Sequence, residues 1–195
     1  MKTKRICVFC GSSAGTDPAF SAAAKKVGEG LAQRGLELVY GGGNVGLMGV
    51  VADAALSGGG RVIGVIPQSL VDRELAHRRI SELRIVSSMH ERKALMADLS
   101  DAFIALPGGY GTVEEFCEIL TWAQLGLHQK PIGLLNVEGY FDPLLAFLDH
   151  AVEEGFLRAE HRAILLDHSE PQTLISRLLE YRPVATEKWI GRESV

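Results

Sequence analysis

The sequence lacks any long uncharged hydrophobic run. Its longest stretch without Asp, Glu, Lys or Arg is Leu38–Ala52, and five glycines and an asparagine interrupt it. Such a stretch is too short and too broken to span a bilayer, so we expect no membrane insertion. The basic start, Met1–Arg5, leads into a strand-like segment without the apolar region or cleavage site of a signal peptide. We therefore expect a cytoplasmic protein.

An excess of charge of one sign is also missing. The chain has 20 basic and 24 acidic residues, a formal net charge of -4. This balance provides no broad positive surface for a nucleic-acid backbone, so we expect no nucleic-acid partner. Locally, the cluster of His77, Arg78 and Arg79 is basic enough to hold one small anion.

Cysteine is scarce, and the three that occur are Cys7, Cys10 and Cys117. An odd count argues against a disulfide framework. Cys7 and Cys10 form a C-x-x-C pair, but the apolar run Ile6–Phe9 indicates a buried strand, and their odd spacing places them on opposite faces of it. No second Cys or His pair follows at ligand spacing, so we expect buried packing and neither a metal nor a redox site.

Glycine, by contrast, is abundant: 22 of the 195 residues are glycine, while 47% of the residues are hydrophobic. The glycines follow no three-residue period, which excludes a collagen-like chain. The length suits one globular domain with a single core. We expect that domain over residues 1–183, followed by a C-terminal tail over residues 184–195.

Short runs of Val, Ile and Leu alternate with longer helical patterns, which predicts a doubly wound, Rossmann-like α/β fold with a mainly parallel sheet of about seven strands and helices on both faces. The predicted strands are Arg5–Cys10, Glu37–Tyr40, Arg61–Ile66, Leu83–Val86, Ala102–Leu106, Ile132–Leu135 and Ala163–Leu166. The predicted helices are Pro18–Gln33, Leu47–Leu56, Met89–Leu99, Val113–Leu125, Phe141–Glu153 and Pro171–Tyr181.

Nine glycines fall in three strand-to-helix turns, after the first, second and fifth predicted strands. Ligands of open parallel sheets bind at this carboxyl edge, where glycine lets backbone amides approach an anion at the start of a helix. A tight turn without a ligand is the alternative for any one loop, and three loops on one edge favour a phosphate site. Gly58–Gly60, at the other end of a β/α unit, instead predict a helix stop. The nine are Gly11, Gly15, Gly41, Gly42, Gly43, Gly46, Gly108, Gly109 and Gly111.

The second loop, Gly41–Gly46, matches the dinucleotide pattern G-x-G-x-x-G, which is weak by itself. About 20 residues on, the chain has no acid placed for a ribose diol, and Gly-Lys-Ser/Thr is absent from the sequence. A mononucleotide or a sugar phosphate therefore fits better than NAD or ATP.

The third loop, Pro107–Glu115, ends in two acidic residues, Glu114 and Glu115. Thr112 and Glu115 have capping-box spacing, so one interpretation is a helix start in which Glu115 satisfies an amide. The other interpretation is catalytic, because a carboxylate beside a phosphate site is costly unless it stabilises a cationic, oxocarbenium-like centre.

A second charged group follows the fourth predicted strand. Ser88 and Glu91 again have capping-box spacing. Arg92 and Lys93 lie in the first turns of the predicted helix, where cations oppose the helix dipole unless an anion compensates them. A solvated basic pair is the alternative to a functional one.

These segments resemble the LOG (LONELY GUY) family of cytokinin riboside 5'-monophosphate phosphoribohydrolases, whose members are often labelled lysine decarboxylases. The resemblance runs from Ile6 to about Tyr181, without departure at the motifs. The motifs are Cys10–Ser13 (C-G-S-S), Tyr40–Gly49 (Y-G-G-G-N-V-G-L-M-G), Met89–Lys93 (M-H-E-R-K), Pro107–Glu115 (P-G-G-Y-G-T-V-E-E) and Thr121–Gly126 (T-W-A-Q-L-G).

The resemblance implies hydrolysis of the N-glycosidic bond of AMP or an N6-substituted AMP, giving free base and ribose 5-phosphate. It implies that Arg92 and Glu115 are catalytic, and that the protein is a homodimer. It also implies a set of substrate-binding residues, of which the glycine loop holds the 5'-phosphate: Ser12, Gly43, Glu74, Met89, Lys93, Gly108, Gly109, Tyr110, Gly111, Thr112, Glu114 and Thr121.

The residue chemistry agrees with that reaction, because an ionised Glu115 suits an oxocarbenium-like state and Arg92 suits a bidentate partner. We expect no metal or organic cofactor. A non-catalytic carrier of a nucleotide or of molybdenum cofactor is the alternative function, although it would not need Arg92 and Glu115 together. A pyridoxal-dependent lysine decarboxylase is a weaker one, since Lys93 is better explained by anion binding.

Overall fold

The computed structural model describes residues 4–73 and 75–183, and it confirms the α/β fold. Seven strands form one sheet in the order β4-β3-β2-β1-β5-β6-β7, and each neighbouring pair is parallel. The strands are β1 (Arg5–Phe9), β2 (Glu37–Tyr40), β3 (Val62–Pro67), β4 (Glu82–Val86), β5 (Ala102–Ala105), β6 (Ile132–Leu135) and β7 (Leu165–His168). The predicted C-terminal tail and Glu74 lie outside the described residues.

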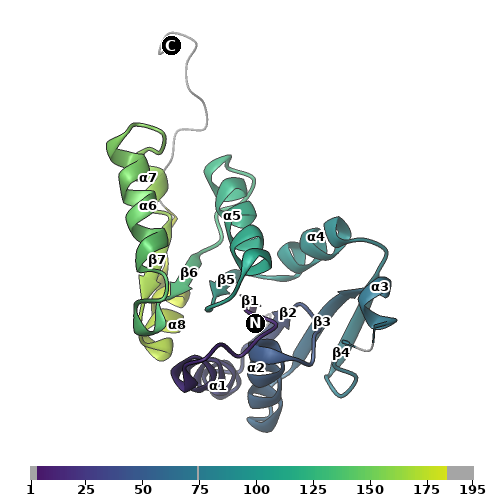
Figure 1. Cartoon of the computed structure of the whole chain (residues 1–195). Coiled ribbons are helices and arrows are strands. Elements are labelled where there is room, and N and C mark those ends of the chain that lie inside the picture. The colour runs from purple at the N-terminus through teal and green to yellow at the C-terminus, as the bar shows by residue number, and fades with distance from the viewer. Residues whose placement is uncertain (1–3, 74, 184–195) are drawn as a thin grey trace.

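Helices cover both faces of the sheet (Figure 1). One layer contains α1 (Pro18–Gln33), α2 (Gly46–Ser57) and α8 (Pro171–Glu180), and the other contains α4 (Met89–Leu99), α5 (Tyr110–Gln124) and α6 (Asp142–Glu153). Three short elements complete the described chain: α3 (Gln68–Val71), α7 (Ala159–Arg162) and the 3-10 turn η1 (Val137–Gly139).

The strands divide their side chains between two hydrophobic clusters, as the two-residue period of a strand requires. In β1, Ile6 and Val8 join the cluster beneath α1, α2 and α8, while Cys7 and Phe9 join the cluster beneath α4 and α5. Cys10, just after β1, belongs to the first cluster. The prediction that Cys7 and Cys10 are buried on opposite faces is therefore confirmed.

The strand order reverses between β1 and β5, and the loops that follow these two strands meet there. The Gly11 amide donates a hydrogen bond to the Pro107 carbonyl (3.0 Å), and the Leu47 amide at the start of α2 donates to the Gly11 carbonyl (3.1 Å). Gly46 has φ +56°, and a Cβ atom there would stand 2.3 Å from the carbonyl carbon of Ser12. Backbone contacts thus bring the glycine loops to one edge of the sheet, and at Gly46 they leave no room for a side chain.

Most predicted element bounds lie within two residues of the observed ones, and α5 is an exception. It begins at Tyr110, three residues before the predicted Val113, because the Gly109–Thr112 segment already forms the first helical turn. The helix stop at Gly58–Gly60 is confirmed, since Gly58 caps α2 and Gly59 has φ +78°. The short elements α3, α7 and η1 were not predicted.

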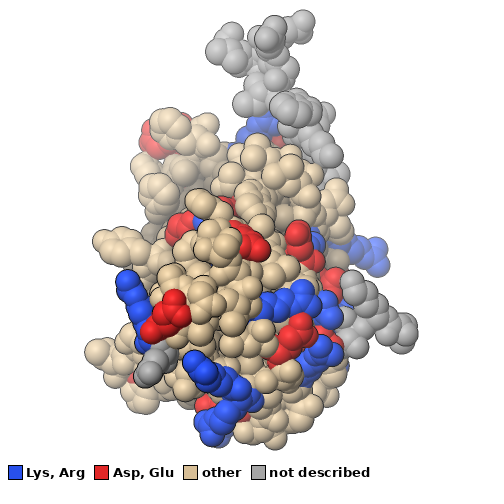
Figure 2. All heavy atoms as spheres, turned by 90° about the vertical axis from the view of Figure 1, so that its right-hand side faces the viewer, with Lys and Arg blue, Asp and Glu red and all other residues tan. Residues whose placement is uncertain are grey.

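The face that carries the β4 edge is a mixture of basic and acidic side chains (Figure 2). Glu82 on β4 accepts hydrogen bonds from Arg61 (2.6 Å) and Arg84 (2.7 Å), so opposite charges are paired within this face. No helix in the described parts of the chain is long and apolar enough to cross a membrane.

Candidate active site

A cavity of about 400 Å³ opens at the carboxyl edge of the sheet, a size within the usual range of small-molecule sites. The glycine loops after β1, β2 and β5 form its floor, and the first turns of α4 and α5 form two of its sides. Its lining includes most of the predicted site residues: Ser12, Gly43, Met89, Arg92, Gly109, Tyr110, Gly111, Thr112, Glu114 and Glu115.

Arg92 and Glu115 form an ion pair within this cavity, although they come from different helices. Arg92 Nη1 lies 3.1 Å from Glu115 Oε1, and each side chain is 10% exposed. Arg92 was expected either as part of a site or as one of a solvated basic pair. Its burial shows that the second interpretation is wrong.

Two backbone carbonyls hold the other nitrogens of the Arg92 guanidinium. Arg92 Nε donates to the Val65 carbonyl on β3 (3.1 Å), and Nη2 donates to the Gly41 carbonyl after β2 (3.4 Å). The carboxylate and the two carbonyls compensate a cation that would otherwise oppose the dipole of α4. They also fix the plane of the guanidinium.

Burial raises the pKa of the Glu115 carboxyl above its ordinary value, while the Arg92 charge opposes this shift and nearby Glu114 adds to it. The capping-box interpretation of Thr112 and Glu115 is wrong. The residue that caps α5 is Gly109, and Glu115 extends from the second helical turn toward Arg92. The Glu115 side chain therefore lines the cavity, paired with Arg92, and does not cap the helix.

The first turn of α5 presents unpaired backbone amides to the same cavity. The first helical hydrogen bond runs from the Val113 amide to the Gly109 carbonyl (3.1 Å), so the amides of Tyr110, Gly111 and Thr112 precede it. Such amides, together with the positive end of the helix dipole, form an anion site. The structure thus places a cradle suited to a phosphate beside Glu115.

Gly108 lies just behind this cradle and borders a neighbouring cavity of about 300 Å³. A Cβ atom on Gly108 would stand 2.1 Å from Thr112 Oγ1 and 2.8 Å from the Gly11 amide nitrogen. The close approach of the loops after β1 and β5 therefore requires glycine at this position.

The start of α4 confirms Ser88 as the capping residue, whereas Glu91 reaches one residue further back than a capping box requires. Ser88 Oγ accepts a hydrogen bond from the Glu91 amide (3.1 Å), and the Glu91 carboxylate accepts from the Ser87 amide (2.7 Å) and hydroxyl. These bonds lower the pKa of Glu91 below its ordinary value. They fix the helix start that carries Met89 and Arg92 into the cavity.

Lys93 does not line the cavity but joins α4 to α5. Its ammonium group donates to Glu114 and, at 3.1 Å, to Glu118. The hydrogen bond to Glu114 is the main reason why the pKa of Lys93 is raised. Lys93 thus joins α4 to the second and third turns of α5, next to the Arg92–Glu115 pair in both helices.

Thr121 is not brought to the cavity. It lies two turns after Glu115 on α5, donates its hydroxyl hydrogen bond to the Cys117 carbonyl (2.8 Å) and lines a separate apolar cavity between α5, α6 and α7. Glu74, the remaining predicted residue, lies outside the described residues.

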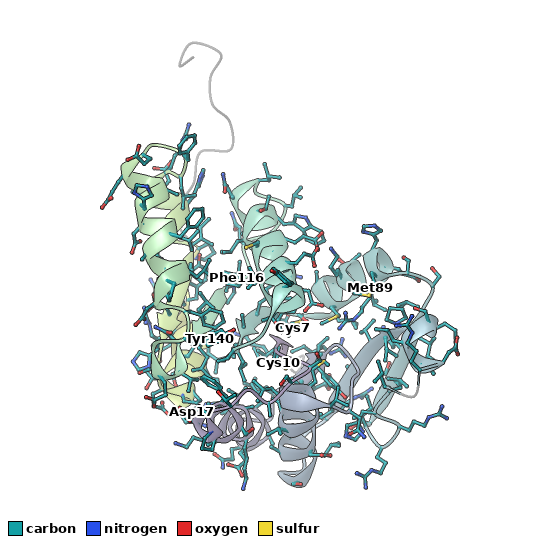
Figure 3. The ribbon with its side chains drawn as sticks, viewed as in Figure 1. Cys7, Cys10, Asp17, Met89, Phe116 and Tyr140 are labelled. Atoms are coloured by element: carbon teal, nitrogen blue, oxygen red, sulfur yellow. The ribbon has the colours of Figure 1, made fainter. Side chains whose placement is uncertain are left out.

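The structure adds residues that sequence reasoning missed. Tyr140, just after η1, donates its hydroxyl hydrogen bond to the Gly108 carbonyl (2.6 Å). Figure 3 shows Tyr140 and Met89 on opposite sides of Cys10. No motif marks Tyr140, since its contact with Gly108 depends on how η1 returns to the sheet.

The apolar side of the cavity was also missed. It contains Leu70 on α3 and Leu75 in the segment after it, whose sequence has no regular period. The prediction that His77, Arg78 and Arg79 together could hold a small anion is wrong for His77. Its side chain is 1% exposed, and its Nε2 lies 3.0 Å from Asp53 Oδ1. The remaining apolar lining includes Val45, Met48 and Ile66.

Comparison with known proteins identifies relatives across almost the whole chain. The profile of a family described as "Possible lysine decarboxylase" matches residues 48–178. A protein of Oryza sativa subsp. japonica named "Cytokinin riboside 5'-monophosphate phosphoribohydrolase LOG" is 54% identical over 180 residues, which is 92% of this chain and 74% of that protein. An Arabidopsis thaliana protein with the same activity in its name, LOG1, is 54% identical over 182 residues, which is 93% of this chain and 85% of that protein.

Among solved structures, the molybdenum cofactor binding protein of Rippkaea orientalis has the same fold. The TM-score is 0.71 at 24% sequence identity, and the match covers 92% of this chain and 98% of that one. The molybdenum cofactor carrier protein of Chlamydomonas reinhardtii matches with a TM-score of 0.70 at 20% identity, covering 92% of this chain and 100% of that one. At these identities the likeness concerns the fold alone.

Proposed function

The chain belongs to the family of the cytokinin riboside 5'-monophosphate phosphoribohydrolases, and from that premise we propose that it hydrolyses the N-glycosidic bond of adenosine 5'-monophosphates. The products are the free base and ribose 5-phosphate. The substrate class includes N6-substituted nucleotides and AMP itself. The observation that carries the proposal is the buried Arg92–Glu115 pair beside the amides that begin α5.

The 5'-phosphate binds at the start of α5 in this proposal. The amides of Tyr110, Gly111 and Thr112 face it, and the dipole of the 15-residue helix favours its charge. Binding energy from the phosphate, which does not react, orients the ribose so that its anomeric carbon faces Glu115.

Cleavage breaks the bond between the anomeric carbon and the base nitrogen, and the electron pair leaves with the base. The ribose then approaches an oxocarbenium ion, which an ionised Glu115 stabilises. Water adds to the anomeric carbon, and Glu115 accepts a proton from it. That proton reaches the departing base, so the carboxylate is regenerated.

Arg92 keeps Glu115 ionised and oriented. Burial favours the neutral form of Glu115, whereas the guanidinium 3.1 Å away favours the carboxylate. Because Gly41 and Val65 already accept hydrogen bonds from two guanidinium nitrogens, the geometry favours Arg92 as the orienting partner of Glu115 over a direct role in releasing the base.

A lysine decarboxylase, as the family description suggests, would need an amine able to form a Schiff base with pyridoxal phosphate. Lys93 follows Arg92 directly in the chain, and its two carboxylate partners raise its pKa and keep it protonated. A protonated amine is not nucleophilic, so these contacts support the hydrolase.

The experiment that tests the proposal incubates the purified protein with AMP and isopentenyl-AMP in EDTA and measures free base by chromatography. We expect base from at least one nucleotide, with an equal amount of ribose 5-phosphate. Tight binding of intact nucleotides without any base would instead support a carrier. The ratio of kcat/KM for the two nucleotides decides whether AMP or the prenylated nucleotide is preferred.

We also propose a homodimer. Leu125 and Leu127 at the end of α5 are 59% and 69% exposed, and the apolar cavity that contains Thr121 lies beside this helix. A second copy on this surface would cover them. Light scattering after size exclusion should give twice the mass of the 21.1 kDa chain.

The cytoplasm is the proposed compartment. Cys7, Cys10 and Cys117 are free thiols, which suits a reducing environment. Fractionation of cells that produce the tagged protein tests this proposal.

A further inference from the structure

The chain between α3 and β4 crosses the glycine loop that follows β2. We call residues 75–80 the strap. The Asn44 amide donates to the Leu75 carbonyl (2.9 Å), the His77 amide donates to the Gly42 carbonyl (2.8 Å), and Gly43 pairs with Ala76 as an antiparallel bridge. The strap therefore lies directly against the loop that forms part of the cavity floor.

The strap contributes Leu75 to one wall of the candidate active site. Leu75 lines the same cavity as Arg92 and Glu115, beside Leu70 of α3 and Ile66 of β3. This wall is apolar, whereas the start of α5 offers polar amides. If the phosphate binds at α5, as proposed above, the wall is left for the base end of the nucleotide.

His77 is the buried polar side chain of the strap, with 1% of its surface exposed. Its Nδ1 accepts a hydrogen bond from the Arg79 amide (3.3 Å), so Nε2 carries the proton. Nε2 lies 3.0 Å from Asp53 Oδ1 and donates to it. Both ring nitrogens of a neutral histidine are thus used.

Asp53 belongs to α2, and its side chain is 57% exposed. The other contacts of the strap described above are with backbone atoms of a glycine loop, which has more conformational freedom than a helix. Through Asp53, His77 ties the strap to a regular helix that packs against α1 and the sheet. The hydrogen bond between His77 and Asp53 therefore restricts the movement of the strap and, with it, of Leu75.

We propose that His77 and Asp53 are positioning residues that hold the strap as the base-side wall of the cavity and so set the affinity for the nucleotide. The pair touches neither the Arg92–Glu115 pair nor the start of α5. It acts on binding in the ground state and the transition state alike, so its loss raises KM and leaves kcat unchanged. This inference rests on the proposed function, because it assumes that a nucleotide occupies the cavity.

The test compares Asp53→Ala with Asp53→Asn. Alanine removes the acceptor of the His77 Nε2–H, whereas the asparagine oxygen retains it without the charge. We expect Asp53→Ala to raise KM for AMP about fivefold, with kcat within about twofold of wild type. Asp53→Asn should keep the wild-type KM. Because Asp53 is exposed, both variants should fold, which circular dichroism and thermal melting check.

Glu29→Ala is the matched control, since Glu29 is an acid on the neighbouring helix α1, distant from the strap in sequence, and among the described residues its ion-pair partner is Lys25. It should behave as wild type. His77→Ala should raise KM as Asp53→Ala does, and the double variant should be no worse than His77→Ala, because the two residues act through one contact.

An unchanged KM in Asp53→Ala would overturn the inference. A fall of kcat alone would do so too, since it would indicate an effect on the chemical step. An equal rise of KM in Asp53→Asn and Asp53→Ala would also overturn it, because it would show that KM depends on the charge of Asp53 and not on its hydrogen bond to His77. All three outcomes assume that the wild-type protein releases base from AMP. If it does not, the proposed function fails first, and the two failures are distinguished.

Discussion

Arg92 Nη2 lies where a side chain on Gly41 would have to be. The nitrogen is 3.4 Å from the Gly41 carbonyl oxygen, and a Cβ atom on Gly41 would come within 1.9 Å of it. The second glycine loop therefore serves the arginine of the ion pair, in addition to any contact it makes with a ligand.

Gly41→Ala therefore tests whether turnover depends on the position of the Arg92 guanidinium. We expect the methyl group to displace the Arg92 head from the Gly41 carbonyl and from Glu115. Overpacking of this kind costs about 1–3 kcal/mol, so the melting temperature falls by several degrees and kcat falls by about 100-fold. A variant with wild-type kcat would show that the position of Arg92 does not matter.

Glu115→Gln separates catalysis from binding. The amide keeps the shape of the side chain but neither stabilises an oxocarbenium ion nor accepts a proton from water. We expect kcat to fall by about 1,000-fold, while calorimetry still detects AMP binding. Wild-type turnover in this variant would remove Glu115 from the chemistry.

The pH dependence follows from the raised pKa of Glu115. The ionised form of Glu115 is active in our mechanism, so kcat/KM falls as the pH drops through the pKa of Glu115. That pKa lies above the ordinary value of about 4.3 for an exposed glutamate. Glu114 contributes to the raised pKa, so Glu114→Gln should move the acid limb to lower pH. Loss of the Arg92 charge in Arg92→Met should move it to higher pH. Comparison with wild type cancels the titration of the substrate phosphate, and a limb that moves the other way would contradict this assignment.

Gly111→Ala tests the phosphate cradle without disturbing the fold. A Cβ atom at Gly111 would meet nothing within 4 Å, and its backbone lies within the first turn of α5. Alanine should therefore keep or slightly raise the melting temperature. The same methyl group enters the space assigned to the phosphate, so we expect KM to rise about tenfold. An unaltered KM would place the phosphate elsewhere.

Tyr140→Phe removes the hydrogen bond to the Gly108 carbonyl. One such bond contributes about 1 kcal/mol, so we expect the loop after β5 to be less ordered and KM to rise roughly fivefold. Steady-state kinetics and a melting curve are the measurements. The matched control is Tyr181→Phe, at the end of α8, which should keep the wild-type KM.

The sequence predicted the regular part of this molecule well. Buried strands of Val, Ile and Leu, with glycines after three of them, were sufficient to place the loops after β1, β2 and β5 at one edge. The conflict between Arg92 and the dipole of α4 was a sound indication that an anion lies nearby. That anion is Glu115 of the same chain.

The rest depends on contacts that sequence patterns do not express. The segment that contains Leu75 and His77 has no regular hydrophobic period from which its structure could be predicted. Its path depends on backbone hydrogen bonds to Gly42 and Asn44. Thr112 lies within the first turn of α5, which already begins at Tyr110 although that turn contains Gly111, and the close approach of Gly108 to Gly11 holds the loop that leads into it. These are tertiary effects that override local propensity.

The backbone carbonyls that hold Arg92 have a consequence for how the protein can diverge. Because the carbonyls of Gly41 and Val65 are present whatever side chains surround them, the orientation of the guanidinium is insulated from mutation of the apolar wall. Substitutions at Val45, Leu70 and Leu75 can then alter the shape of the recognition surface while the reactive pair stays in place. Selection or design can therefore change which nucleotide is preferred through the apolar wall, without changing the Arg92–Glu115 pair.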